Sequence, residues 1–346
     1  MKKLMFSLLV LPMAMIATAQ KGPESTPYMT KEFNASGIKS VESTTSGGNI
    51  SVSGTAGGQA KVEVFIHSGN SRKELSREEI QHRLNEDYDV KVEMSGQKLV
   101  ASAKPKKRNM NWNNSLSISF VIYVAKNTET NLTTSGGNIN LDELTGRQEF
   151  TTSGGNLKIN KLSGDVKCRT SGGNINVQNS DNKLDLTTSG GNIHAENCNG
   201  ELRLSTSGGS IDLTALKGNI DATTSGGNVR GSNIAGELEA HTSGGNVRLE
   251  NLSCDINAST SGGNVSVGVT TPGKFVKLSN SGGSISLVLP ANKGYDMKIS
   301  GDRVKTENLA NFKGDIEEDE IEGAVNGGGT AVTVRASSGR VSVSMK

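Results

Sequence analysis

A short motif, Thr-Ser-Gly-Gly-Asn or a close variant of it, recurs every 18 residues and constrains the fold more than any other feature. The serines that mark this interval are Ser135, Ser153, Ser171, Ser189, Ser207, Ser225, Ser243 and Ser261. Further copies begin at Ser46 and, after a longer gap of 20 residues, at Ser281. A fixed period of this length is typical of a solenoid, in which each repeat forms one coil of a stack.

Apolar residues alternate with polar ones at two places in each repeat. If the motif serine is counted as position zero, positions 4 and 6 are mostly apolar, and so are positions 13 and 15. Alternation of this kind predicts two short strands per coil, each pointing two side chains inward. A three-sided helix of hexapeptides would need apolar residues at every sixth position, and this chain does not have them.

The sequence therefore predicts an all-β fold, a parallel β-solenoid of about eight 18-residue coils with two sheets facing each other across a thin core. Parallel crossovers favour a right-handed turn. Glycines stand at both corners of the coil, and we expect them to supply backbone angles that a Cβ forbids. The glycines of the second corner are Gly146, Gly164, Gly200, Gly218 and Gly236.

The stack needs a cover at each end, because an exposed end leaves strand edges and apolar side chains open. We expect residues 20–134 to form N-terminal strands and a cover, 135–290 the regular coils, and 291–346 a C-terminal cover. Ser76 and Glu79 form a capping box that opens a short helix ending near Asn85. The strands expected outside the regular coils are Lys61–His67, Tyr88–Met94, Lys98–Lys104, Leu116–Ala125, Ala331–Arg335 and Arg340–Met345.

Residues 1–19 have the pattern of a signal peptide: Lys2 and Lys3, an apolar stretch, and the small residues Ala17 and Ala19 before the expected cleavage site. We therefore expect an exported protein, in the periplasm, on the outer surface or secreted, with no transmembrane segment. Removal of Lys2 and Lys3 takes the formal net charge from +2 to zero. A neutral chain has no long-range attraction for nucleic acid, so we expect no nucleic-acid partner.

The three cysteines lie at different positions of their coils, which argues against disulfides. Cys198 and Cys254 belong to coils three apart. At a strand spacing of ~4.8 Å they would be about 14 Å distant. A disulfide requires Cα atoms within about 7 Å.

A basic segment with the only tryptophan of the chain is the main candidate for ligand binding. Lys106, Lys107 and Arg108 could hold an anionic group, and Trp112 could stack on a sugar ring. The alternative is a solvated hairpin loop whose tryptophan folds back onto the cover. The acidic run 317–320 carries the opposite charge, which would permit end-to-end self-association.

The asparagines of the motif would stack directly above one another, as Asn138, Asn156, Asn174, Asn192, Asn228, Asn246 and Asn264. Stacked amides form hydrogen-bonded ladders along the axis of such folds. We therefore interpret this row as a structural ladder at the corner, with a row of ligand-binding amides as the alternative.

The residues of common catalytic and metal sites are absent from the repeat. The four histidines are scattered, and the corners carry Asn and Ser where calcium-binding nonapeptide repeats carry Asp. Polysaccharide-cleaving solenoids gather acidic and basic side chains in one groove, and Asp212, Arg230 and Arg248 come nearest to that, with Asp212 and Arg230 expected to form an ion pair. We expect no enzyme, no metal and no cofactor.

The iterated Thr-Ser-Gly-Gly-Asn-(Ile/Val)-x-apolar pattern, with a glycine and a second apolar pair nine residues later, resembles the bacterial putative adhesin family over residues 38–345. The resemblance implies a parallel β-helix and a domain of unknown function in exported or envelope proteins. Our leading hypothesis is an exported, non-catalytic β-solenoid that presents an extended surface to an unknown cell-surface, glycan or envelope component. The alternative is a carbohydrate-active or carbohydrate-binding β-helix protein.

Overall fold

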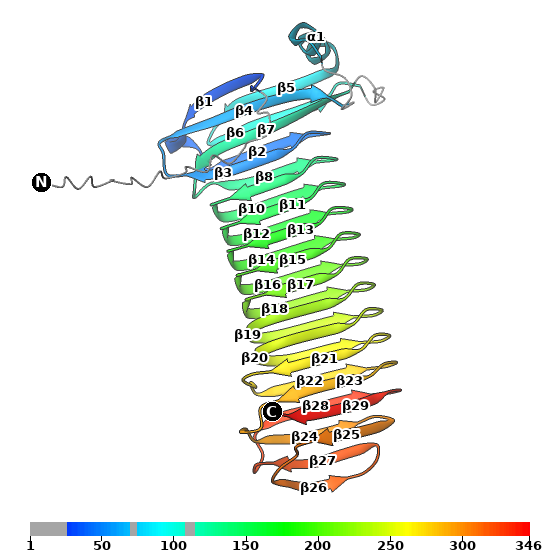
Figure 1. Ribbon diagram of the computed structural model, residues 1–346. Helices are drawn as coiled ribbons and strands as arrows, with labels where there is room; N and C mark the ends of the chain where they lie inside the picture. Colours follow the sequence, from blue (N-terminus) through cyan, green and yellow to red (C-terminus); the bar gives the residue numbers. More distant parts are fainter. Residues whose placement is uncertain (1–25, 70–74, 108–114) are drawn as a thin grey trace, which may run out of the picture.

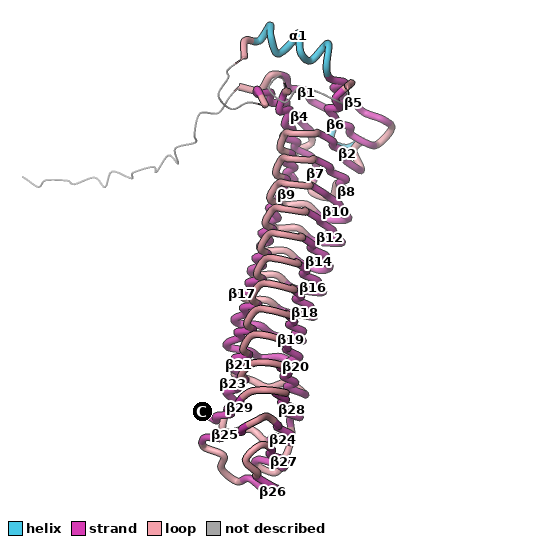
Figure 2. The backbone as a smooth tube through the Cα atoms, turned by 90° about the vertical axis from the view of Figure 1, so that its right-hand side faces the viewer, coloured by secondary structure: helices cyan, strands magenta, loops and turns pink. Residues whose placement is uncertain are grey.

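The computed structural model describes residues 26–69, 75–107 and 115–346. Within them it is an all-β solenoid, in which short strands lie one above another along a single long axis (Figure 1). Turned by 90°, the same molecule shows two columns of strands with a thin core between them (Figure 2). The expected all-β solenoid is confirmed. The signal-peptide prediction for 1–19 lies outside the described residues.

One column, which we call stack A, contains the strand that follows each Ser-Gly-Gly corner. In spatial order it consists of β7 (Leu116–Ala125), β3 (Ile50–Thr55), β9 (Ile139–Asp142), β11 (Leu157–Asn160), β13 (Ile175–Gln178), β15 (Ile193–Glu196), β17 (Ile211–Thr214), the first halves of β19 (Val229–Thr242) and β20 (Val247–Thr260), β21 (Val265–Val269), β23 (Ile285–Leu289), β29 (Arg340–Met345) and β25 (Arg303–Glu307). All of these neighbours are parallel.

The other column, stack B, contains the strand that precedes each corner. In spatial order it consists of β6 (Lys98–Pro105), β2 (Ser40–Thr45), β8 (Glu129–Thr134), β10 (Thr145–Thr152), β12 (Ser163–Thr170), β14 (Asp181–Thr188), β16 (Asn199–Thr206), β18 (Lys217–Thr224), the second halves of β19 and β20, β22 (Phe275–Asn280), β28 (Thr330–Ala336) and β24 (Tyr295–Ser300). Equivalent residues pair 18 apart, as Leu184 does with Leu202.

The core contains the expected apolar positions and two that our sequence analysis missed. Position 9 is buried in successive coils, at Leu144, Leu162, Ser180, Cys198, Leu216, Ile234 and Leu252. The threonine before each motif serine is buried as well, at Thr152, Thr170, Thr188, Thr206, Thr224, Thr242 and Thr260. Each coil therefore buries six columns of side chains, of which one is a hydroxyl column.

The Ser-Gly-Gly corner needs glycine for a reason other than the one we expected. Neither glycine of the motif has a positive φ. A Cβ built on the second glycine would instead lie 1.8 to 2.2 Å from a backbone oxygen of the neighbouring coil, as for Gly173 against Gly155. A Cβ on the first glycine would meet its nearest neighbour at 3.2 to 3.9 Å, as at 3.8 Å for Gly172. The second glycine of the motif is therefore required because neighbouring coils pack closely at this corner.

The second corner does use left-handed backbone angles. Gly146, Gly164, Gly200, Gly218 and Gly236 have φ between 95° and 136°. Three residues before the position of these glycines, a column of non-glycine residues also has φ between 52° and 58°: Glu143, Lys161, Asn179, Asn197, Ala215, Asn233 and Asn251. Asparagine is the residue that tolerates this region best after glycine, and it occupies more than half of that column.

At the N-terminal end the chain order and the spatial order differ. The coil made by β2 and β3 lies between the coil of β8 and β9 and the coil of β6 and β7. Antiparallel strands extend this end: β4 (Gln59–Ser68) pairs with β7, β1 (Met29–Asn34) with β4, and β5 (Tyr88–Ser95) with β6. The strands occur where the sequence predicted them, and a short 3-10 helix, η1 (Ala35–Gly37), precedes β2.

The helix α1 (Arg77–Asp87) begins at the expected cap and ends two residues beyond the expected position. The Ser76 Oγ accepts a hydrogen bond from the Glu79 backbone N–H at 3.2 Å. The helix lies beyond β5 at this end of the molecule (Figure 1). Its Arg77 guanidinium donates to the Tyr28 carbonyl at 3.2 Å and lies over the Tyr28 ring.

At the C-terminal end, too, the spatial order of the coils differs from their order in the chain. The coil made by β28 and β29 lies between the coil of β22 and β23 and the coil of β24 and β25, although β24 and β25 come earlier in the chain (Figure 1). The antiparallel strands β27 (Glu320–Val325) and β26 (Phe312–Ile316) then complete the end. No helix among the described residues is long and apolar enough to cross a membrane.

Candidate functional site

From β10 to β18 the outward side chains of stack B form columns in which charges of opposite sign are neighbours, and beyond β18 acidic residues are neighbours, as Asp221 is to Glu239. At position 14 the column reads Glu149, Lys167, Asp185, Arg203 and Asp221. Arg203 approaches Asp221 at 3.8 Å, and at position 12 Lys183 approaches Glu201 at 4.0 Å. Opposite charges at cross-strand distance stabilise a solvated sheet, so we interpret these charges as stabilising the fold and not as a binding site.

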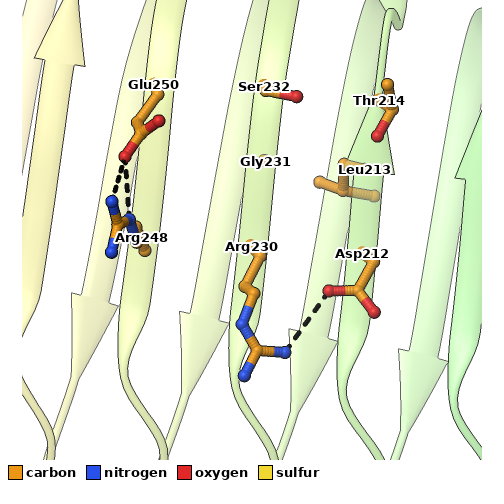
Figure 3. A pocket seen from close by; sticks show the side chains of 8 residues that line it. All are labelled: Asp212, Leu213, Thr214, Arg230, Gly231, Ser232, Arg248 and Glu250. Atoms are coloured by element: carbon orange, nitrogen blue, oxygen red, sulfur yellow. Dashed lines mark hydrogen bonds and ion pairs between the residues drawn. The ribbon is translucent and has the colours of Figure 1, made fainter.

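Stack A differs where β17, β19 and β20 lie side by side. Here the outward residues form a grid of two rows: Asp212, Arg230 and Arg248 in one row, and Thr214, Ser232 and Glu250 in the other (Figure 3). A shallow hollow of about 230 Å³ is lined by these residues together with Leu213 and Gly231. Ser232 is short and lies between longer neighbours, and the surface is therefore recessed above it.

Both arginines of the grid have an acidic partner (Figure 3). Arg230 Nη1 lies 3.4 Å from the Asp212 Oδ1, which confirms the expected pair. Arg248 has a partner that the sequence analysis missed: its Nη2 lies 2.7 Å from the Glu250 Oε1, two residues along the same strand. Alternate residues of a strand lie on the same face, so the two-residue spacing of Arg248 and Glu250 already indicated this ion pair in the sequence.

Arg230 and Arg248 are direct neighbours in the parallel register. Like charges opposite each other destabilise a sheet, and the two side chains extend away from one another (Figure 3). The arginine side chains are 53% and 69% exposed. Exposed pairs of this kind hold their partners weakly, so both guanidinium groups are accessible to a ligand.

The described part of the basic segment, which ends at Lys107, contacts α1. The Lys106 Nζ donates to the Asn85 carbonyl at 2.5 Å, and the Lys107 Nζ lies 3.0 Å from the Asp87 Oδ1. Cations are favourable at this end of a helix, where carbonyl groups are unpaired. The hydrogen bond that Lys107 donates to the Asp87 carboxylate also raises the pKa of Lys107. Both lysines therefore contact the helix, whereas Arg108 and Trp112 lie outside the described residues.

The motif asparagines form a continuous row that joins side chain to backbone. Each Oδ1 accepts the backbone N–H of the equivalent residue in the next coil, as Asn138 does from Asn156 at 2.8 Å. The same bond is made by Asn156, Asn174, Asn192, Asn228, Asn246 and Asn264 at 2.7 to 2.9 Å, and Ser210 Oγ continues the row at 3.1 Å. The amide oxygens are thus engaged within the stack.

The cysteines are buried and free, and burial raises the pKa of each thiol: to about 11 for Cys198, to about 12 for Cys254, and further for Cys168. A protonated, buried thiol is a poor nucleophile. Across the described ranges, no group of three or more His, Cys, Asp or Glu side chains is placed to hold a metal ion.

Comparison with known proteins supports the fold and leaves the site unassigned. Residues 179–344 match a family model. The family is described as Toastrack DUF4097, a β-solenoid domain of unknown function, and the matched residues include the whole grid of stack A. No curated protein matches the sequence.

One matching solved structure is that of a putative cell adhesion protein from Clostridium sporogenes, which is 12% identical. The alignment covers 92% of this chain and 98% of that chain, with a TM-score of 0.21. A likeness at this level carries no weight for function.

Proposed function

We propose that this chain is an exported, non-catalytic β-solenoid whose long outer faces serve adhesion or contact with the cell envelope. The observation that carries the proposal is the shape: a rigid, hydrogen-bonded stack holds outward side chains in register over a long distance (Figure 2). Repeat proteins use such extended surfaces for binding. The partner would be a cell-surface, glycan or envelope component, met in the periplasm, on the outer surface or outside the cell.

The finer features of the fold belong to the same proposal. We infer about eight regular coils and a right-handed turn, because parallel crossovers are almost always right-handed. The motif pattern supports a place in the bacterial putative adhesin family. Charged residues on the outermost strands, such as Lys313 and Asp315 on β26, oppose strand addition and favour a stack that does not extend end to end.

Localisation and retention test this proposal. Full-length protein expressed with residues 1–19 should lose them and appear in the exported fractions, and a Lys2→Glu, Lys3→Glu variant should remain inside the cell. Purified residues 20–346 should sediment with isolated cell envelopes and not with envelopes stripped of polysaccharide and protein. Retention of the protein inside the cell, or no sedimentation with any envelope, would contradict the proposal.

A carbohydrate-active protein is the second candidate, because the grid of stack A brings the carboxylates of Asp212 and Glu250 to one hollow. Incubation with a panel of polysaccharides, followed by chromatography of their chain length, separates the two. Shortening that Asp212→Asn abolishes would establish an enzyme and overturn the leading proposal.

A further inference from the structure

We propose that the hollow of stack A binds an acidic polysaccharide, through a carboxylate or sulfate group held between Arg230 and Arg248. The inference rests on the proposed function and names the ligand class and the site. Its starting point is a pair of like positive charges: Arg230 and Arg248 are direct neighbours on β19 and β20, whereas the like-charged neighbours of stack B, Asp221 with Glu239 and Glu237 with Asp255, are acidic.

The geometry of the grid suits an anion above Ser232. Ser232 is the middle residue of its row, with Thr214 on one side and Glu250 on the other, and Arg230 is two residues before it on the same strand. The hydroxyls of Ser232 and Thr214 can donate to an oxyanion. The guanidinium of Arg230 has five N–H donors, and its ion pair with Asp212 engages only Nη1. The Arg230 guanidinium is directed away from Ser232, toward Asp212 (Figure 3), so an anion above Ser232 gains this donor when the exposed side chain turns back along its strand.

Two arginines are better suited to this task than lysines. A guanidinium presents paired N–H groups that match the two oxygens of a carboxylate or sulfate. An anion between Arg230 and Arg248 would also remove the repulsion that their register creates. The unbound protein relieves that repulsion by directing Arg230 to Asp212 and Arg248 to Glu250, at 3.4 Å and 2.7 Å.

The ligand is inferred to be a polymer because the hollow is shallow and its arginines are exposed. A single small anion would leave most of its surface in water and bind weakly. A chain that carries acidic groups at regular intervals presents many equivalent groups, and repeated presentation raises the apparent affinity. The neighbouring strands of stack A offer room for such a chain to lie across the sheet.

Binding of residues 20–346 to polygalacturonate, dextran sulfate and neutral dextran, measured by isothermal titration calorimetry, tests the proposal. Polygalacturonate and dextran sulfate distinguish carboxylate from sulfate as the group recognised, and dextran should not bind. The Arg230→Ala, Arg248→Ala double variant should weaken binding on the order of 10- to 100-fold, as expected when charge-assisted hydrogen bonds are lost. Equal binding of dextran, or no binding of either acidic polymer, would overturn the proposal.

Stack B supplies a matched control. Arg147 pairs with Glu149 two residues along its strand at 3.1 Å, as Arg248 does with Glu250, and Arg203 pairs across strands with Asp221, as Arg230 does with Asp212. The Arg147→Ala, Arg203→Ala variant removes the same charge from the other face and should retain nearly full affinity. An equal loss in this variant would show attraction by net charge alone and would overturn the site.

The carboxylates of the grid give the sharpest distinction between an acidic and a neutral ligand. Glu250→Gln removes a group that competes for Arg248, and binding of an acidic polymer should strengthen several-fold. A neutral sugar would instead lose a charged acceptor, because the amide oxygen of glutamine accepts more weakly, and its binding would weaken. Weakened binding of polygalacturonate and dextran sulfate in Glu250→Gln would therefore overturn the proposal.

Failure of this inference can be separated from failure of the proposed function. Envelope sedimentation that persists in the Arg230→Ala, Arg248→Ala variant would overturn the site and leave the adhesion role standing. Absence of envelope sedimentation in the unsubstituted protein, together with polygalacturonate binding that the double variant loses, would support the site and overturn the envelope role. Circular dichroism and thermal unfolding of each variant verify that the stack remains folded.

Discussion

The two corners of each coil both contain glycine and both pack closely against the next coil, but only the second corner also needs left-handed backbone angles. At the Ser-Gly-Gly corner the second glycine lies against the carbonyl of the coil beside it, and no Cβ fits. At the second corner the chain turns through left-handed angles, and two coils have another residue at the glycine position. Asn182 stands there with φ of 81°, and Cys254 stands there without a positive φ. A Cβ on Gly164, Gly200, Gly218 or Gly236 would also lie 2.1 to 2.3 Å from a backbone oxygen of the next coil. The second corner nevertheless accommodates Asn182 and Cys254 in this column, whereas the second glycine of the Ser-Gly-Gly corner is never replaced in the regular coils.

The largest expected effect comes from a methyl group added to the Ser-Gly-Gly corner. In Gly191→Ala the new Cβ would lie 1.9 Å from the Gly173 oxygen, so neighbouring coils must separate. We expect a loss of about 3 kcal/mol or more in the free energy of unfolding, measured by urea denaturation. Gly190→Ala is the matched control, because its nearest neighbour is 3.6 Å away. A similar loss in both variants would remove the distinction between the two glycines.

The buried threonine next to this corner should have the second largest effect. The Thr206 Oγ1 donates to the Gly191 carbonyl at 2.8 Å and accepts the Gly209 backbone N–H at 3.3 Å. Thr206→Val keeps the shape but leaves both backbone groups without this partner, at a cost of about 1 to 3 kcal/mol. Thr206→Ser retains the hydroxyl and should restore most of the loss in the same denaturation experiment.

The asparagine row should contribute less, because it is exposed to water. Asn192→Ala removes the acceptor of the Ser210 backbone N–H at 2.7 Å. We expect a loss of about 1 kcal/mol, and Asn192→Asp, which keeps an acceptor oxygen, should lose less. If Asn192→Ala were neutral while glycan binding fell, the row would have to be reinterpreted as a ligand-binding surface.

At the second corner the same substitution should have opposite effects on stability at two alanines of successive coils, whose positions in the repeat differ by two residues. Ala215 has φ of 53°, so Ala215→Gly relieves strain and should stabilise the protein by about 0.5 to 1 kcal/mol. Ala235, in β19, does not have a positive φ, and Ala235→Gly should destabilise it by a similar amount. Thermal unfolding measures both, and a destabilised Ala215→Gly would show that backbone strain does not govern this corner.

The smallest effect concerns pH. Glu143, at the second corner, lies 2.7 Å from the Lys126 Nζ and 2.9 Å from the Lys161 Nζ, and these hydrogen bonds lower the pKa of its carboxyl from 4.5 to about 2. A lowered pKa means that the stabilisation is complete above pH 4.5 and is lost as the pH falls toward about 2. Carboxyl ¹³C NMR titration should show this midpoint, and Lys126→Ala should raise it. An unperturbed midpoint would contradict the two ion pairs.

The sequence predicted the features that repeat and missed those that depend on contact between distant segments. The period, the alternating strands and the capping box at Ser76 each arise from local chemistry, and all are found. The buried column at position 9 was also readable, since five of its seven members are Leu or Ile. The inverted order of coils at both ends was not, because β2 pairs with β6 across more than 50 intervening residues and no local pattern encodes that choice.

The candidate site was predictable only in part. Asp212, Arg230 and Arg248 were readable as a column, and the register made the pair between Asp212 and Arg230 a direct consequence. The recess above Ser232 depends on the relative sizes of side chains on three adjacent strands, which become visible only when the coils are stacked. The contact of Lys106 and Lys107 with α1 depends on the path of the chain at the N-terminal end.

The position of β28 and β29 inside the stack has a consequence for the order in which the protein can be completed. Synthesis proceeds from residue 1 onward, so β24 and β25 are made before the strands on which they pair in parallel. Until residues 330–345 are available, the neighbouring edges of β22 and β23 remain unpaired as well. Unpaired edges readily bind other chains. The interval between synthesis of residue 307 and of residue 345 is therefore the time at which a growing chain is most exposed to aggregation at this end.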